Sequence, residues 1–354
     1  MTAEVWESVA QADSSLTPFQ TSTWRDCLCA SGEWRDASRC YELPDGRVLV
    51  LMMACQRARP AMLARAASWP SGWGSGGIIA TGGTRPDDVA LVAADMASSA
   101  FLSTTVRPSF TAAASWAAAA VPAFTIPRAV HVADLGQPFE EFWGSLPKRS
   151  RAKVRSARRH AEEAGITFAR GNSVELVDAF YQVYLRWIDW RAERRQMPRQ
   201  MARRLAQRRE PLQKFATVAS GLGQDCQIWV AQWQGQPVGA AISLYAGETG
   251  ISWRAFTDRS VPSRFRIHEL LITERLQHAC QRGVRYLELG ESVGARNLAS
   301  LKERMGGREH AFAEYCFDRL PISRGRVAFQ RFRQGSEAWV LSHRTPPEQG
   351  QAAS

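Results

Sequence analysis

The stretch that decides the fold runs from Cys226 to Tyr245 and reads CQIWVAQWQGQPVGAAISLY. Two apolar runs, 226–233 and 237–245, lie on either side of Gln234-Gly235. Apolar runs joined by a short glycine-containing turn are typical of an antiparallel β-hairpin. The sequence therefore predicts two neighbouring antiparallel strands.

The segments after this hairpin predict a mixed sheet. A third strand, a long helix that ends at Gly283 and a fourth strand follow in this order: 250–256, 262–282 and 286–289. A helix between two strands of one sheet makes them parallel, so the sheet can splay where the strand orientation changes. The other predicted elements of this half are strands at 166–170 and 312–317 and helices at 174–195, 198–220 (broken at Pro211) and 295–305. This order indicates an α/β protein whose sheet is mixed, with both parallel and antiparallel strands (α+β).

The first half alternates apolar runs with small-residue helices and predicts a domain of its own. We expect strands at 47–53, 101–106 and 125–132 and a helix at 86–99. The glycine-rich loop 69–83 contains no Gly-Lys-Ser/Thr and no G-x-G-x-x-G, so turns explain it better than a phosphate cradle. The predicted division is a first domain 1–137, a connecting basic helix 138–165, a second domain 166–320 and a partly disordered extension 321–354.

Composition narrows the class of protein. The chain has 354 residues, of which 45% are hydrophobic, and this length suits two domains with real cores. No signal peptide and no long apolar run is present, so we expect a cytoplasmic protein without a membrane span. Seven cysteines, an odd number, form no C-x-x-C pair, which argues against a disulfide framework or a metal site. The formal net charge of +11 favours polyanionic partners.

Two tracts hold much of the positive charge. The first contains Lys148, Arg149, Arg151, Lys153, Arg155, Arg158 and Arg159; the second contains Arg186, Arg191, Arg194, Arg195, Arg199, Arg203, Arg204, Arg208, Arg209 and Lys214. A run of charges is commonly a solvated helix face, but acidic residues are sparse here, and phosphate binding is an equal alternative. Trp187 and Trp190 lie within the second tract and either stack on bases or pack the helix.

Several motifs follow one another along the chain: Phe142-Trp143 with the basic run 146–157, Glu163-Ala164-Gly165-Ile166, the segments 269–271 and 279–290, and Leu298-Ala299-Ser300-Leu301-Lys302-Glu303-Arg304-Met305-Gly306-Gly307. Together, and in this order, they resemble the FemAB-like branch of the GNAT superfamily. The resemblance covers about residues 139–318 and implies two GNAT-like domains in tandem, the second better formed. Leu301 and Met305 stand where the family usually has Phe, and no long helical arm is present.

The resemblance implies a set of catalytic residues. It places Lys302 beneath the splay, where an ammonium group can stabilise the oxyanion formed when an amine attacks an acyl carbonyl. Trp253 and Arg254 border the splay on opposite faces of one strand. Further candidates for acid–base roles are Tyr245, Glu288, Glu269, Glu291 and His268. Since no Ser-His-Asp or Cys-His arrangement with a nucleophile elbow appears, direct transfer is favoured over a covalent intermediate.

The donor is predicted from the loop before the long helix. CoA-dependent GNAT enzymes have a glycine-rich turn there, but here the loop has no glycine and contains Pro262. The candidate phosphate-binding residues are Arg259, Arg264, Arg266, Lys148, Arg151, Arg155, Arg204 and Arg208. The leading hypothesis is an aminoacyltransferase that takes its acyl group from aminoacyl-tRNA, with no tightly bound cofactor, no metal and no DNA partner. Its acceptor would be a small-molecule amine from cell-wall precursors or secondary metabolism. An acyl-CoA N-acyltransferase and an RNA-binding protein on an inactive GNAT scaffold are the alternatives.

Overall fold

One sheet runs through both halves of the molecule. The computed structural model describes residues 2–57, 60–292, 295–320, 322–325 and 327–328. Within these residues, eleven strands form a sheet in the order β1-β4-β5-β7-β14-β8-β13-β12-β11-β10-β9, and β2-β3-β6 form a second, smaller sheet. The mixed α/β architecture predicted from the sequence is confirmed.

The first half contains more elements than its patterns predicted. Its helices are α1 (Ala3–Ala12), α2 (Ser22–Ala30), α3 (Pro86–Ala97) and α4 (Ala113–Ala119), with 3-10 turns η1 (Pro18–Gln20), η2 (Ala61–Leu63) and η3 (Phe110–Ala112). Its strands are β1 (Trp34–Asp36), β2 (Arg39–Glu42), β3 (Val48–Met52), β4 (Ala54–Gln56), β5 (Arg65–Ser68), β6 (Gly77–Ala80), β7 (Ser103–Val106) and β8 (Phe124–Asp134). The expected strands at 47–53, 101–106 and 125–132 correspond to β3, β7 and β8.

The second half follows the predicted order closely. Its helices are α5 (Phe139–Ser145), α6 (Lys148–Glu163), α7 (Val174–Arg194), α8 (Arg199–Arg209), α9 (Leu212–Leu222), α10 (Ile267–Gln281) and α11 (Arg296–Arg304), with 3-10 turns η4 (Gly223–Asp225) and η5 (Ser263–Phe265). Its strands are β9 (Thr167–Gly171), β10 (Cys226–Trp233), β11 (Gln236–Ala246), β12 (Thr249–Thr257), β13 (Tyr286–Glu291) and β14 (Gly307–Asp318). The predicted extension 321–354 lies largely outside the described residues.

The long helix begins later than predicted. Arg266 adopts a left-handed conformation with φ of 43°, which separates η5 from α10, and the helix therefore starts at Ile267 instead of Pro262. Its end is as predicted, because Gly283 follows with φ of 71°, a backbone conformation that glycine adopts without strain. Residues 69–83 are not only a loop: β6 lies among them and pairs with β3 through Leu49↔Ala80.

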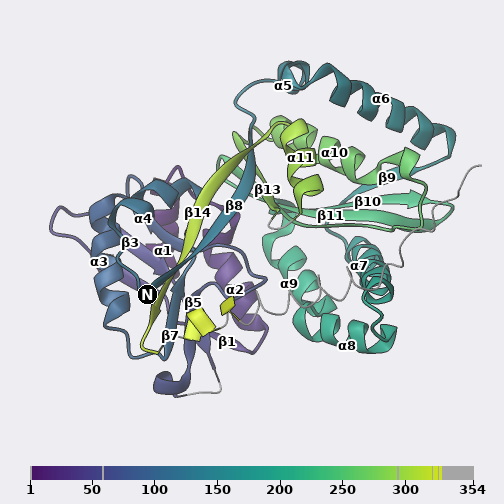
Figure 1. Cartoon of the computed structure of the whole chain (residues 1–354). Helices are drawn as coiled ribbons and strands as arrows, with labels where there is room; N and C mark the ends of the chain where they lie inside the picture. The colour runs from purple at the N-terminus through teal and green to yellow at the C-terminus, as the bar shows by residue number, and fades with distance from the viewer. Residues whose placement is uncertain (1, 58–59, 293–294, 321, 326, 329–354) are drawn as a thin grey trace, which may run out of the picture.

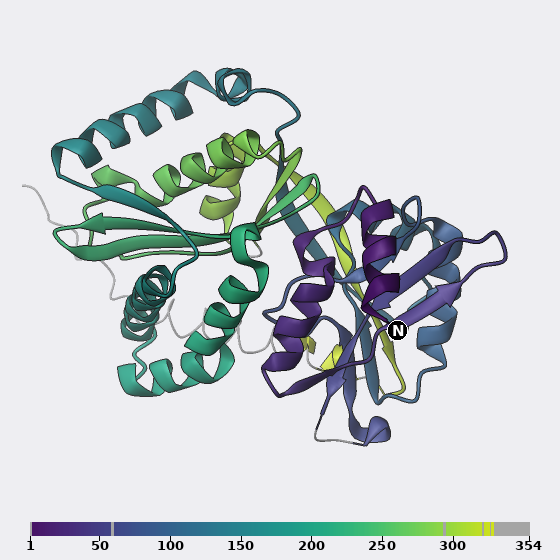
Figure 2. The ribbon, with the colours of Figure 1, turned by 180° about the vertical axis from the view of Figure 1, so that it is seen from behind.

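Helices cover the second half of the sheet on both faces. α10 packs on β11 and β12, and α6 covers α10, whereas α7 packs on the opposite face with α8 and α9 against it (Figure 1; Figure 2 shows the same layers from behind). The two basic tracts therefore lie on opposite sides of the sheet, α6 on one and α8 on the other. This layer of strands separates the two tracts, so they do not form one surface.

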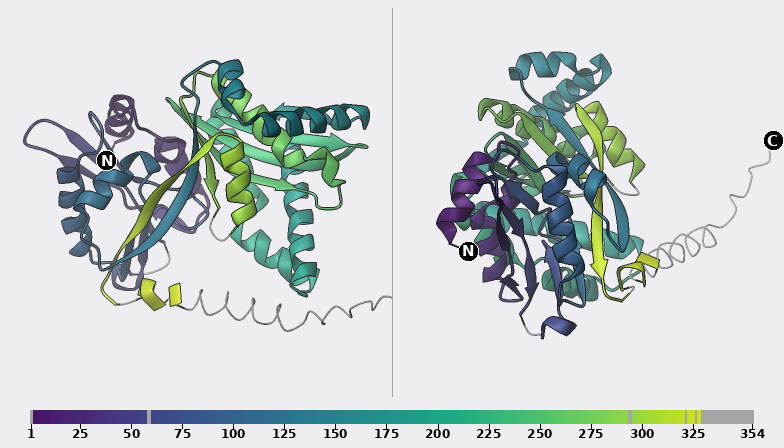
Figure 3. Two further views of the ribbon diagram at one scale, coloured as in Figure 1. Left: turned by 45° about the horizontal axis from the view of Figure 1, so that its top comes forward. Right: turned by 90° about the vertical axis from the view of Figure 1, so that its left-hand side faces the viewer.

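Strands β8 and β14 connect the two halves of the sheet. β14 pairs with β8 from Gly307 to Cys316 and then with β7 from Tyr315 to Asp318, so the last strand of the fold enters the sheet of the first half. Figure 3 shows these two long strands crossing from one half to the other. The hydrophobic core is continuous as well, because Trp24 and Trp73 pack with Trp253. The second domain therefore shares its sheet and its core with the first.

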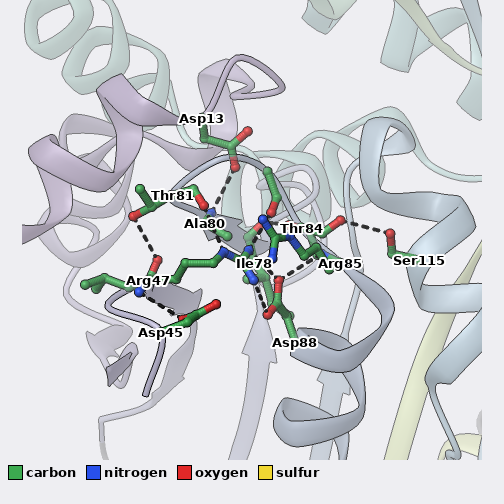
Figure 4. Close-up of polar contacts among 12 residues, drawn as sticks. Asp13, Asp45, Arg47, Ile78, Ala80, Thr81, Thr84, Arg85, Asp88 and Ser115 are labelled. Atoms are coloured by element: carbon green, nitrogen blue, oxygen red, sulfur yellow. Dashed lines mark hydrogen bonds and ion pairs between the residues drawn. The ribbon is translucent and has the colours of Figure 1, made fainter. Parts of the chain in front are cut away.

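A salt bridge in the first domain joins the start of β3 to α3. The Arg47 guanidinium donates to both Asp88 carboxylate oxygens at 2.9 and 2.8 Å, which ties β3 to the first turn of α3. The Asp88 carboxylate also accepts from the backbone N–H of Arg85, and Asp13 accepts from the backbone N–H of Ala80 (Figure 4). These contacts lie away from the splay, and we assign them a structural role.

Candidate active site

The predicted splay is present. β12 and β13 pair in parallel only from Thr249↔Tyr286 to Ile251↔Glu288, although β12 continues to Thr257 and β13 to Glu291. Beyond these pairs the two strands part. A cavity of about 810 Å³ opens there, lined by residues from both strands and from the surrounding helices.

Lys302 lies in the wall of this cavity. α11 presents it, and the side chain is buried, with 5% of its surface exposed. Its ammonium donates to the carbonyl oxygens of Gly290 at 2.8 Å and Glu291 at 2.9 Å, at the end of β13. An ammonium group has three N–H donors, so one remains for a ligand in the cavity. Burial lowers the Lys302 pKa to about 8, although the nearby Glu288 opposes the shift.

Glu288 lies beside Lys302 on β13. Burial raises the pKa of its carboxyl group to about 7, against the attraction of Arg107 and Lys302. Its carboxylate lines the cavity. A carboxyl group that titrates near neutrality can take a proton and return it, which is what general acid–base catalysis requires.

Trp253 and Arg254 both line the cavity. The sequence predicted that only one could face it, and this expectation is corrected by a bulge. Ile242 pairs with Arg254 and Ser243 with Ser252, so Trp253 is an extra residue between two normal pairs. A bulge interrupts the alternation of side chains along a strand. The Trp253 indole N–H is buried without a hydrogen-bond partner among the described residues.

Helix α10 contributes two further basic side chains to the cavity. His268 lines it, and burial together with Arg275 and Arg259 lowers the imidazole pKa to about 3, so His268 is neutral. Arg275 is buried, donates to the Leu271 carbonyl at 3.0 Å and contacts the Ser252 hydroxyl. Burial lowers its pKa to about 10, and it therefore stays charged at neutral pH.

The first half supplies one side of the cavity, which the sequence analysis missed. Gly72 faces Glu210 and Arg254, and its carbonyl accepts from Arg254 and from Lys214, each at 2.8 Å. Glu210 pairs with the same two cations at 2.9 and 3.0 Å. No local pattern marks these residues, because their role depends on contacts between segments more than 130 positions apart.

A pair of arginines from the first half also lines the cavity. Arg107 follows β7 and Arg128 lies on β8; both are ion-paired with Glu291, and Arg128 also donates to Glu314 at 2.8 Å. Burial and the neighbouring Arg128 lower the Arg107 pKa. Glu291, a sequence-predicted candidate for acid–base chemistry, is therefore held in an ion-pair network.

Tyr245 is not brought to the cavity. It is buried in the core on the α10 side of the sheet, where its ring lies 5.6 Å from that of His278. Burial raises its pKa to about 12, so the phenol stays protonated. Glu269, another sequence candidate, is ion-paired with Arg266 at 2.7 Å and does not line the cavity.

The sequence-predicted phosphate-binding residues also lie outside the cavity lining: Arg259, Arg264, Arg266, Lys148, Arg151, Arg155, Arg204 and Arg208. Arg259 lies over the Trp190 ring at 5.3 Å, Arg264 over Phe265 at 4.8 Å, and Arg151 donates to the Leu146 carbonyl. Three other arginines, Arg191, Arg195 and Arg209, line the cavity instead.

The loop before α10 does not form an open anion cradle. The backbone N–H groups of Asp258, Ser260, Phe265 and Arg266 each donate within the protein, to Val238, Asp258, Pro262 and Ser263. Pro262 has no N–H to offer. A phosphate could use these four N–H groups only by displacing their internal hydrogen bonds, which supports the sequence argument against a typical CoA pyrophosphate site.

A metal site is equally unsupported in the described part of the chain, where no group of three or more His, Cys, Asp or Glu side chains could hold an ion. Cys27 is buried and Cys29 half-buried in α2, as expected for packing residues. Among the same residues, no helix is long and apolar enough to cross a membrane.

Comparison with known proteins agrees with this geometry. Residues 148–297 match the family model described as an acetyltransferase (GNAT) domain. The crystal structure of FemX superposes with a TM-score of 0.62 at 11% sequence identity, covering 92% of this chain and 98% of FemX. A conserved protein of unknown function from Bacteroides thetaiotaomicron VPI-5482 superposes with a TM-score of 0.52 at 10% identity, over 89% of this chain and 97% of its own. No curated protein matches the sequence.

The predicted resemblance is thereby confirmed. The match to the GNAT domain model covers residues 148–297. The overall fold of the chain is that of the FemAB-like branch, since the likeness to FemX extends over nearly the whole of both chains.

Proposed function

We propose that this GNAT-fold acyltransferase forms amides by direct transfer of an aminoacyl group from aminoacyl-tRNA to a small-molecule amine. The observation that carries the proposal is the open splay, where Lys302 and Glu288 line one cavity and have pKa values of about 8 and about 7. In the same range of pH, the Lys302 ammonium can therefore be charged while the Glu288 carboxylate can accept a proton.

The proposed reaction is a direct displacement at the acyl carbonyl. The acceptor amine attacks the ester carbon, a C–N bond forms, and Glu288 accepts the proton that the amine nitrogen loses. The negative charge on the carbonyl oxygen is stabilised by the third N–H of Lys302. The tetrahedral intermediate then collapses, the C–O bond to the donor breaks, and the departing oxygen receives the proton from Glu288.

The loop 258–266 is the basis for the proposed class of acyl donor. Four of its N–H groups are used internally and Pro262 has none, so the loop offers a CoA pyrophosphate fewer backbone donors than a glycine-rich turn does. The ester of an aminoacyl-tRNA is already activated and is positioned by contacts to the rest of the RNA, which need only surface cations. Exposed arginines of α8 provide such cations.

An acyl-CoA donor remains the second candidate, favoured by the match to an acetyltransferase domain model. A turnover assay with a panel of amines distinguishes the two candidate donors. The donor supplied is either a mixture of aminoacyl-tRNAs or acetyl-CoA. Product from the RNA donor that disappears after RNase treatment supports the proposal. Product from acetyl-CoA that is indifferent to RNase overturns it.

Lys302→Met tests the catalytic part and separates an enzyme from an RNA-binding protein on an inactive scaffold. We expect the variant to lose at least about a hundredfold in kcat/KM, because one oxyanion donor typically contributes that much, and to keep its affinity for RNA. Wild-type RNA binding without turnover of either donor would indicate the binding protein instead.

A further inference from the structure

The second basic tract borders the cavity, and the first does not. α8 places Ala202, Leu205, Ala206 and Arg209 in the cavity wall, next to Arg191 and Arg195 from the end of α7. No residue of α6 contributes to the described lining. α6 packs instead on α10 and η5, across the sheet (Figure 1).

The cavity itself is strongly positive. Eight basic side chains line it, against three acidic ones: Arg107, Arg128, Arg191, Arg195, Arg209, Arg254, Arg275 and Lys302, against Glu210, Glu288 and Glu291. An excess of positive charge in a concave, partly desolvated site attracts anionic ligands. The positive potential continues from the cavity on to α8, whose exposed residues include Arg203, Arg204 and Arg208.

Besides Arg209, which lines the cavity, the arginines of α8 fall into two groups. Arg199 pairs with Glu193, and Arg203 pairs with Asp189 through two hydrogen bonds, so these two hold α8 against α7. Arg204 and Arg208 are exposed and lie one turn apart on the helix. Neither side chain forms an ion pair or a hydrogen bond with another described residue. Two such guanidinium groups on one face suit successive phosphates of a backbone.

The two tryptophans of this region differ in position, because Trp187 lines the cavity and Trp190 is not part of its described lining. Two guanidinium groups, those of Arg194 and Arg259, lie over the Trp190 ring at 5.3 Å each, which favours a packing role for Trp190. Trp187 lines the cavity, with Arg191 4.7 Å from its ring centre and the Phe256 ring 5.0 Å away. Aromatic side chains that line a basic site are residues on which unpaired bases stack.

We infer that α8 and the end of α7, and not α6, form the RNA-binding surface of this protein. The RNA backbone contacts Arg204 and Arg208, and the single-stranded 3′ end passes Leu205 and Trp187 into the cavity. This inference rests on the proposed function, because only a 3′-esterified RNA needs a path to Lys302. An anionic membrane is the less suitable partner: Met201 and Leu205 are the only large apolar side chains that the described α8 exposes, too narrow a stripe for insertion into a bilayer.

The experiment compares matched charge reversals on the two helices. Arg204→Glu/Arg208→Glu on α8 and Arg155→Glu/Arg159→Glu on α6 each reverse two exposed arginines spaced by four residues. The affinity of full-length protein for total deacylated tRNA is measured by fluorescence anisotropy at several salt concentrations. We expect the α8 variant to lose at least about tenfold in affinity and about two from the slope of log K against log salt. The α6 variant should stay within about twofold of wild type.

Each other outcome overturns the inference. An α6 variant that loses as much affinity as the α8 variant assigns RNA to both faces or to α6. An α8 variant that keeps tRNA affinity but no longer binds phosphatidylglycerol vesicles makes the surface a membrane contact. Wild-type protein that turns over aminoacyl-tRNA, with an unaffected α8 variant, refutes the inference alone, whereas wild-type protein that neither binds nor uses tRNA refutes the proposed donor too. Arg204→Gln/Arg208→Gln, which removes charge without adding repulsion, should give a smaller loss in the same direction.

Discussion

Glu288→Gln should make the protein more stable at alkaline pH. Burial raises the pKa of this carboxyl group from 4.5 to about 7, which means that the fold disfavours its ionised form. Below pH 4.5 the group is protonated in both the folded and the unfolded states, and it does not affect stability. Between 4.5 and about 7 only the unfolded state ionises, so stability falls as the pH rises, and above about 7 the penalty is constant.

The size of the effect follows from the same shift. At about 1.4 kcal/mol per pH unit, a rise from 4.5 to about 7 lowers the free energy of unfolding by about 3 kcal/mol at pH 8. Glutamine has nearly the same shape and no charge, so Glu288→Gln should recover about 2–3 kcal/mol at pH 8 and about zero at pH 4. The same variant should lose activity, because it removes the proposed base.

The assay is urea unfolding of wild type and variant at pH 4 and at pH 8. Glu162→Gln is the control, because Glu162 is exposed on α6 and its charge is already hydrated; we expect a change of less than about 0.5 kcal/mol at both pH values. A Glu288→Gln variant that is less stable than wild type at pH 8, or whose gain is equal at both pH values, would refute the reasoning.

Two further predictions concern the cavity. The logarithm of kcat/KM should rise through about pH 7, as Glu288 ionises, and fall through about pH 8, as the Lys302 ammonium loses its proton; a profile that is flat from pH 6 to 9 would contradict both roles. Gly72→Ala should destabilise the protein by about 1–3 kcal/mol more than Gly32→Ala in thermal or urea unfolding. Both glycines have positive φ, but the added Cβ at position 72 would come within 2.7 Å of a Glu210 carboxylate oxygen, whereas position 32 has nothing within 4 Å. Equal losses would show that the contact to Glu210 is dispensable.

The second half of the fold could be predicted from the sequence because its signals are local. The turn at Gln234-Gly235 and the stop at Gly283 each set an element boundary by backbone geometry, and the structure has both. The lining of the candidate site was predicted only in part. Lys302 and Glu288 lie in the cavity, but Tyr245 does not, because a strand position alone does not reveal which layer covers each face.

The remaining features depend on information that no local pattern carries. The bulge at Trp253 changes which side chains face the cavity, and it is set by the register with β11. Gly72 reaches the site through contacts to residues of the second half. The short strands of the first half were missed for a similar reason: β1, β4 and β5 have three or four residues each, too few for a period to be recognised.

The pairing of β14 with β7 has a consequence for biosynthesis. During translation, residues 103–106 leave the ribosome some two hundred codons before their neighbour, residues 315–318, is made. The amino-terminal half must therefore wait with an open sheet edge, and open edges invite pairing with other chains. A nascent chain arrested after residue 300 should accordingly engage chaperones and resist compaction, and synthesis through residue 318 should bring both halves to the native state together.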